Sequence, residues 1–222
     1  MLPVPAPTLG STEEDDAMSD LDPRLQSALA AVEASPDDLG LWDELEDIAA
    51  KLQKPDEVGQ LYRDVLARNL TAAQVAAIGP RASGFHEEWF GEESPYLAEV
   101  LTRVLTLDPR ADWALARVTV LLTVREKWND LLGLYDRALA AAEDSYRKTQ
   151  LLEEAVQLAK DFAGQPDRAI GYLAELSSLR PNDAQLKVSL ERLLERQGRH
   201  EELTARRGAY YHLVKNQLEL GV

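Results

Sequence analysis

From Leu21 onward the chain consists of short helix-forming segments, each closed after a few turns by a proline or a glycine. Ala, Leu, Glu, Gln and Arg dominate these segments, and apolar residues recur three and four positions apart, as at Leu41, Leu45 and Ile48. This spacing places them on one face of an α-helix. No stretch alternates polar and apolar residues as a strand would, so the sequence predicts an all-α protein. The breaks, where helices end or begin, are Pro36, Pro55, Gly79-Pro80, Pro95, Pro109, Gly164, Pro166, Pro181 and Gly198.

The turn signals return at regular intervals, which indicates an internal repeat. Gly164 and Gly198 lie 34 residues apart, and three prolines precede similar helices at intervals of 73 and 72 residues. A tyrosine recurs near the same place in the second helix of three units. The repeat unit is therefore two helices and two tight turns. These recurring prolines and tyrosines are Pro36, Pro109, Pro181, Tyr62, Tyr135 and Tyr172.

The first full unit reads Leu41-Trp-Asp-Glu-Leu, then Pro55-Asp-Glu-Val, then Leu61-Tyr-Arg-Asp-Val-Leu. The Trp, the Leu three later and the Tyr twenty later resemble the spacing of the tetratricopeptide repeat (TPR) family, over about residues 23–215. Glu46 departs from the pattern, because the family has a small residue there. The resemblance implies a right-handed α-solenoid whose first helices line a concave, peptide-binding face. A half-a-TPR repeat or another α-solenoid variant is the alternative.

The expected layout is a flexible acidic, proline-rich tail at 1–20 followed by one TPR-like repeat domain at 21–222. A lone helix near 23–34 would cap the N-terminal end. About five antiparallel helix pairs follow, and stacking would bury the apolar faces that no pair can bury alone. The pairs are expected at 37–53 with 56–69, 80–90 with 95–107, 109–124 with 129–142, 145–162 with 166–179, and 183–197 with 199–215.

The composition excludes several classes of function. The 222 residues contain no Cys and carry a formal net charge of −15. Without Cys there are no disulfides, thiolate nucleophiles or cysteine-bound metals. The net charge argues against binding of nucleic acid or an anionic membrane surface. With no apolar run long enough to span a bilayer and no signal peptide, we expect a cytoplasmic protein, and the Ala/Leu/Arg-rich composition suggests a bacterial origin.

The catalytic inventory is thin. His86, His200 and His212 are too far apart for a local metal motif, and His86-Glu-Glu-Trp-Phe has Phe90 where a zinc-protease helix needs a second His. No phosphate-binding or dinucleotide-binding glycine motif occurs. We therefore expect no enzyme activity, no cofactor and no metal.

Two features suggest binding to another protein or peptide. In residues 85–95, Trp89 and Phe90 lie among acidic residues, and they either anchor a partner's side chain or fold back to seal an irregular repeat. The second feature is the concave face, which would run from acidic through apolar to basic. Its expected exposed residues are Asp43, Asp47 and Lys51, then Ala114, Val118 and Leu121, then Arg192 and Arg196.

A third feature is a basic cluster near the C-terminal end, which would bind RNA or a phosphorylated segment, or serve as an ordinary helix surface. It comprises Arg196, Arg199, Arg206 and Arg207, with Tyr210 and Tyr211 behind it. We expect the ordinary surface, and no nucleic-acid partner, because Glu201 and Glu202 neutralise half of the cluster.

These features together predict a non-catalytic interaction scaffold that binds a partner peptide or helix on its concave surface. Three alternatives remain open. Residues 1–57 carry a net charge of −12, from 15 acidic and three basic residues, whereas residues 180–215 hold eight basic against five acidic residues. Opposed ends of this kind would support head-to-tail self-assembly. The chain would otherwise be the N-terminal piece of a longer repeat array, or position the active site of another protein.

Overall fold

The computed structural model describes residues 22–208, and the chain divides into two compact units, Met1–Leu107 and Asp108–Val222. Helices and short turns make up both units, with no strand anywhere in the described range. The prediction of an all-α protein is therefore confirmed. The predicted flexible tail at 1–20 lies outside the described residues.

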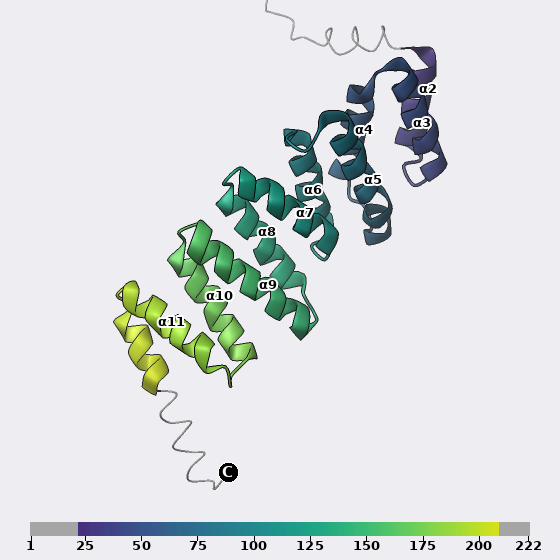
Figure 1. Cartoon of the computed structure of the whole chain (residues 1–222). Coiled ribbons are helices and arrows are strands. Elements are labelled where there is room, and N and C mark those ends of the chain that lie inside the picture. The colour runs from purple at the N-terminus through teal and green to yellow at the C-terminus, as the bar shows by residue number, and fades with distance from the viewer. Residues whose placement is uncertain (1–21, 209–222) are drawn as a thin grey trace, which may run out of the picture. The chain divides into compact units, whose positions relative to one another are not determined.

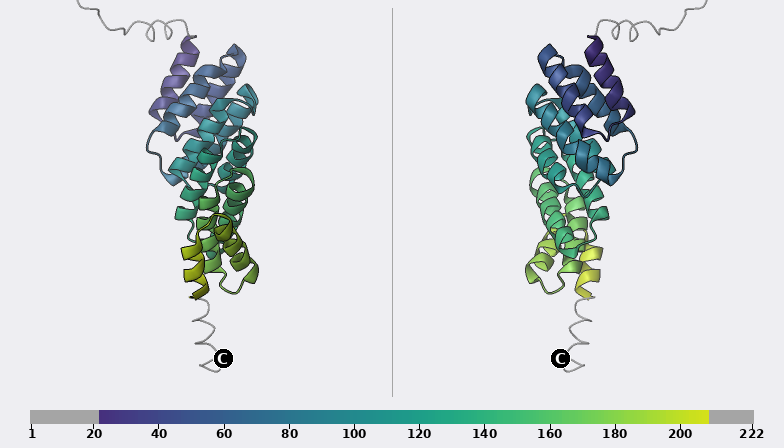
Figure 2. Two further views of the ribbon diagram at one scale, coloured as in Figure 1. Left: turned by 90° about the vertical axis from the view of Figure 1, so that its left-hand side faces the viewer. Right: turned by 90° about the vertical axis from the view of Figure 1, so that its right-hand side faces the viewer.

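Unit 1 consists of helical hairpins in two layers (Figure 1). α4 contacts α2 and α6 in one layer, and α3 and α5 pack against them from the other. Both views in Figure 2 show the same back-and-forth course of the chain within the unit. The helices are α2 (Pro23–Ala34), α3 (Leu39–Leu52), α4 (Pro55–Ala67), α5 (Ala72–Phe90) and α6 (Pro95–Leu107).

Local capping residues set the helix starts of unit 1. Asp22 and Asp38 each accept a hydrogen bond from a backbone N–H in the first turn of the helix that follows. Thr71 and Gln74 form a reciprocal capping box at the start of α5. Pro55 occupies the first position of α4, where no intrahelical N–H bond is lost. Because these signals are local, the predicted starts of α2, α3 and α4 agree with the structure to within two residues.

The prediction for α5 is wrong at its beginning. The sequence placed a break at Gly79-Pro80, yet one helix runs from Ala72 through Pro80 to Phe90. Pro80 supplies no N–H to the carbonyl of Ala76, but both residues are exposed. Water can therefore hydrogen-bond to the freed carbonyl, which makes the interruption tolerable.

The core of unit 1 centres on two aromatic rings. Trp42 of α3 and Tyr62 of α4 are buried and stack with ring centroids 4.0 Å apart. The indole Nε1 of Trp42 donates to the carbonyl oxygen of Pro36 at 2.9 Å, so its polar atom is satisfied. Arg103 of α6 donates to the carbonyls of Leu66 and Ala67 at the C-terminal end of α4, at 2.6 and 2.8 Å. These contacts tie three helices together.

Unit 2 has the same hairpin plan. In Figure 1, α7, α9 and α11 lie on the viewer's side, with α8 and α10 behind them. Each helix packs on its neighbour along the chain, and leucines fill the interface. The helices are α7 (Asp112–Val124), α8 (Trp128–Ala141), α9 (Ser145–Gln157), α10 (Pro166–Leu179) and α11 (Ala184–Arg196).

Between α9 and α10 the chain forms a π-helical turn, η1 (Leu158–Phe162). The N–H of Ala163 donates to the carbonyl of Leu158 at 2.8 Å and closes the wider turn. Phe162 then stacks on Trp128 with centroids 5.9 Å apart. The expected helix at 145–162 thus holds, with its last turn π-helical. The expected helix at 199–215 is seen over residues 200–208, and the rest lies outside the described range.

Candidate functional site

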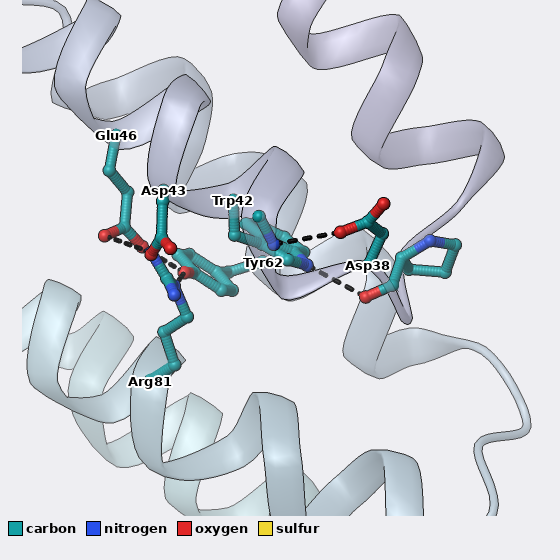
Figure 3. A network of polar contacts seen from close by, with 8 residues as sticks. Asp38, Trp42, Asp43, Glu46, Tyr62 and Arg81 are labelled. Atoms are coloured by element: carbon teal, nitrogen blue, oxygen red, sulfur yellow. Dashed lines mark hydrogen bonds and ion pairs between the residues drawn. The ribbon is translucent and has the colours of Figure 1, made fainter.

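A polar network joins α3, α4 and α5 beside the Trp42–Tyr62 stack (Figure 3). Arg81 donates through Nε and Nη2 to the two carboxylate oxygens of Glu46, at 2.9 and 2.8 Å. The hydroxyl of Tyr62 donates to Glu46 and accepts from Arg81 Nε at 2.9 Å. Asp43 adds a second carboxylate 2.7 Å from Arg81 Nη2. The network is half-buried, since the side chains of Arg81 and Glu46 are 22% and 27% exposed.

The network determines the protonation of its members. Burial, and then the hydrogen bond to Glu46, raise the pKa of the Tyr62 hydroxyl above its ordinary value. Burial lowers the pKa of Arg81, but the hydrogen bonds to Glu46 and Asp43 outweigh it and raise the pKa overall. Tyr62 is therefore a neutral donor and Arg81 a permanent cation. Neither Tyr62 nor Arg81 therefore gives or takes a proton near neutral pH.

This geometry accounts for the acidic residues expected on the concave face. Asp43 is 73% exposed but pairs with Arg81. Asp47 and Lys51 pair with each other one helical turn apart, and both are largely exposed. The three side chains thus lie at the surface as expected, each with a partner inside unit 1. Glu46 accepts the principal hydrogen bonds of the network.

The aromatic residues near the end of α5 pack inside unit 1. Phe90 is half-buried and its ring lies against His86 and Tyr96, with centroids 5.5 and 5.8 Å apart. A Cβ atom built on Gly59 would come within 2.9 Å of the Phe90 ring, so the close approach depends on that glycine. Trp89 is also half-buried, and its ring centroid lies 6.1 Å from that of Phe85. Of the two interpretations made from the sequence, these contacts favour the one in which the aromatics seal the repeat.

His86 is completely buried beneath these rings. Its Nδ1 lies 2.8 Å from the carbonyl oxygen of Ala82, so this nitrogen carries the proton and Nε2 accepts from Arg63 Nη1 at 3.3 Å. Burial is the largest influence and lowers the pKa of His86; the hydrogen bond to the Ala82 carbonyl opposes it, and the nearby Arg63 cation lowers the pKa further. His86 is therefore a neutral core residue.

An open groove runs along α4 on the layer formed by α2, α4 and α6. We call it the α4 groove; its volume is about 490 Å³. Its apolar floor combines side chains from four helices, and acidic side chains of α4 form its rim. It is lined by Leu29, Asp56, Glu57, Gln60, Leu61, Arg63, Asp64, Phe90 and Tyr96. Among these residues, the sequence indicated only Phe90 as a binding candidate, because the others come together through tertiary packing.

The prediction of which face of α7 is exposed is wrong. Val118 was expected to face the concave surface together with Ala114, yet both are fully buried, and Leu121 is half-buried. α7 is apolar on nearly every side, so its periodicity does not indicate which face is covered. The exposed apolar residues form a different line, which we call the α7 stripe: Trp113, Ala116, Val120 and Val124.

The α7 stripe was missed by the sequence reasoning, although its spacing of three, four and four residues is visible. These intervals place the four side chains on one helix face. Val120 and Val124 are 63% and 80% exposed, and Trp113 is 38% exposed. At the N-terminal end of the stripe, Asp112 accepts from Arg147 of α9 at 2.6 Å. An apolar face of this length, left open to water, is typical of a surface that contacts another chain.

The basic residues of α11 and of the helical stretch after it, residues 199–208, divide into two groups. Arg192 and Arg196 are exposed, as expected. Arg199 instead pairs with Asp167 and Glu202. Arg207 pairs with Glu191. Tyr210 and Tyr211 lie outside the described residues. The described part of the cluster is thus partly neutralised, which fits an ordinary helix surface.

The repeated tyrosines share one role. The hydroxyl of Tyr135 donates to Glu154 at 2.7 Å, and that of Tyr172 donates to Asp136 at 2.6 Å, as Tyr62 does to Glu46. Burial is the largest influence, and it raises the pKa of both Tyr135 and Tyr172 above the ordinary value. Each of these three tyrosines therefore links its own helix to another helix through a carboxylate.

Within residues 22–208, no group of three or more His, Asp or Glu side chains is arranged to hold a metal ion. None of the described helices combines the length and apolar character needed to cross a membrane. No family model and no curated protein matches the sequence. The structure thus defines an all-α protein of helical hairpins with two exposed surface features, the α4 groove and the α7 stripe.

Proposed function

We propose that this chain is a non-catalytic protein–protein interaction scaffold. In this proposal residues 21–222 form one TPR-like, right-handed α-solenoid of about five helix pairs, with α2 as its N-terminal cap. The sequence repeat and the hairpin plan within each unit support it. The first helices would provide the binding surface for a partner peptide or helix, without a cofactor or metal. A cytoplasmic location and a bacterial origin belong to the same proposal and rest on composition alone.

The observation that carries the proposal is the α7 stripe. Valine side chains that are 63% and 80% exposed gain little free energy from folding, because most of their surface stays in water. Apolar residues on one face of a helix are the usual anchors for an amphipathic helix or an extended peptide. The Asp112–Arg147 ion pair lies at the N-terminal end of the stripe and leaves Val120 and Val124 exposed. A partner that buries the stripe would recover the missing apolar burial.

Site-specific photo-crosslinking tests this proposal. A benzophenone amino acid replaces Val120 in the full chain, and a matched variant carries it at Ala140, an exposed residue of α8 outside the stripe. The expected result is a defined crosslinked species of one partner from Val120 and none from Ala140. Substitution of Val124 by Glu should abolish the crosslink, because it places a charge in the apolar contact. Equal crosslinking from both positions would contradict the proposal.

Self-assembly is the second candidate function, and exposed cations favour it. Arg192, Arg196 and Arg206 are exposed, whereas residues 1–57 carry a net charge of −12. A head-to-tail contact between such ends would weaken steeply as salt is added, but an apolar contact would not. Light scattering behind size exclusion measures this directly. A mass above the 24.7 kDa of one chain that falls with added salt would favour self-assembly.

A further inference from the structure

The α4 groove has the shape and surface of a binding site for a side chain or short peptide. Its volume of about 490 Å³ lies within the range of clefts that hold ligands. Leu29 of α2, Leu61 of α4 and the rings of Phe90 and Tyr96 provide apolar surface. Tyr96 is 40% exposed, so part of this aromatic surface is accessible from solvent.

The rim of the groove is negatively charged. Asp56, Glu57 and Asp64 contribute three carboxylates, and Arg63 is the only cation among the lining residues. The Arg63 guanidinium is already engaged, because it stacks 4.1 Å from the centroid of Tyr96 and contacts His86. Asp64 accepts one hydrogen bond, from the amide of Gln60 at 2.8 Å. Within residues 22–208 neither Asp56 nor Glu57 has a basic partner, so the rim retains negative charge.

Glu57 adds a second and independent observation. Its carboxylate oxygen Oε2 is shielded from water and accepts no hydrogen bond in the described structure. A buried carboxylate oxygen without a donor is unfavourable. A charged N–H donor held in the groove would supply the missing partner, after a small rotation of the side chain.

The spacing of the acids indicates what kind of ligand fits. Asp56 and Asp64 are eight residues apart on α4, which corresponds to about 12 Å along the helix axis. An extended peptide covers a similar distance with about four residues and directs alternate side chains to one side. Apolar floor and acidic rim can therefore be contacted together by a chain in which basic and apolar residues alternate.

We propose that the α4 groove binds an extended peptide segment of a partner protein in which arginine or lysine alternates with apolar residues. The apolar side chains pack on Leu61, Phe90 and Tyr96, and the basic side chains pair with Asp56, Glu57 and Asp64. This site is separate from the α7 stripe and adds a partner class to the proposed function. The acidic N-terminal segment of this chain is a poor occupant, because its carboxylates would face the same rim.

Fluorescence anisotropy with a labelled peptide of alternating leucine and arginine tests the proposal on the full chain. The groove variant is Asp56→Asn with Asp64→Asn. The control variant, Glu44→Gln with Glu195→Gln, changes the net charge equally at two exposed positions, on α3 and α11, outside the groove. We expect the groove variant to weaken binding about tenfold and the control by less than about twofold. Circular dichroism and melting temperature establish that both variants are folded.

Each other outcome overturns the proposal in a distinct way. Equal weakening by both variants would mean that the peptide binds the acidic surface in general. Free arginine that competes as well as the peptide would indicate a small-molecule site. A variant lacking residues 1–20 that binds about tenfold more tightly would identify this segment as the occupant. Val124→Glu should leave peptide binding unchanged, so failure of the α7 proposal and failure of this one are distinguishable.

Discussion

Replacement of Glu46 by Ala is the sharpest test of what stabilises unit 1. Glu46 accepts three hydrogen bonds, two from the Arg81 guanidinium and one from Tyr62. A hydrogen bond to a charged group contributes about 1.5–3 kcal/mol when it is fully buried. Here the two side chains remain 22% and 27% exposed, and Asp43 stays bonded to Arg81. Water and Asp43 therefore offset part of the loss. We expect Glu46→Ala to lower the free energy of unfolding by about 2 kcal/mol.

Asp47→Ala is the matched control on the same helix. It also removes one carboxylate of α3, but its ion pair with Lys51 is exposed and local. We expect it to lower the free energy of unfolding by less than about 0.5 kcal/mol. The double-mutant cycle of Glu46→Ala with Arg81→Ala should give a coupling of about 1–2 kcal/mol, since the two side chains contact each other directly.

Urea unfolding followed by tryptophan fluorescence measures these differences. Trp113 and Trp128 belong to unit 2, and replacing both with Phe leaves Trp42 and Trp89 as reporters of unit 1. In that background Glu46→Ala should lower the midpoint by about 1 M urea. A loss no greater than that of Asp47→Ala, or a cycle without coupling, would refute the assignment of the network as a main stabilising contact.

Two further predictions concern His86 and Gly59, which pack against the ring of Phe90. Burial lowers the pKa of His86 below its ordinary value of 6.5, so the unfolded chain takes up a proton that the folded chain does not. The contribution of His86 to stability is therefore retained above that pH and lost as the pH falls below it. His86→Gln should make the urea midpoint less dependent on pH between about pH 7.5 and about pH 5.5. Gly59→Ala brings a Cβ against Phe90. Its effect on the free energy of unfolding should be about 1–2 kcal/mol more favourable in a Phe90→Ala background than in the natural sequence. Gly84→Ala is the control, because its Cβ meets no neighbour, and it should raise the free energy of unfolding by about 0.5–1 kcal/mol, measured by thermal unfolding.

Helix boundaries were the most predictable part of the structure, because they depend on neighbouring residues. Asp38 and Asp183 cap the helices that follow them, and Pro55 and Pro166 begin α4 and α10. The exception, at Pro80, is instructive. A proline inside a helix is tolerated when the carbonyl it leaves unbonded faces water, and which side of α5 faces water is decided only by packing.

The binding surfaces were less predictable for a related reason. In α7, apolar residues occupy nearly every side, and the sequence placed Val118 at the surface although it is buried. The exposed Val120 and Val124 belong to the same apolar run. Only the helices that pack against α7 determine which of these side chains is covered. For α11, where Leu190 and Leu194 mark one clear apolar face, Arg192 and Arg196 are exposed as predicted.

The sequence by itself determined the all-α class, the order of the helices and most of their ends, since these depend on composition, periodicity and caps within a few residues. Only the tertiary structure decided that Glu46 would meet Arg81, 35 residues later, and that side chains from α2, α4, α5 and α6 would line one groove. The physical reason is that such contacts depend on how helices pack, and many pairings satisfy the same pattern of apolar residues.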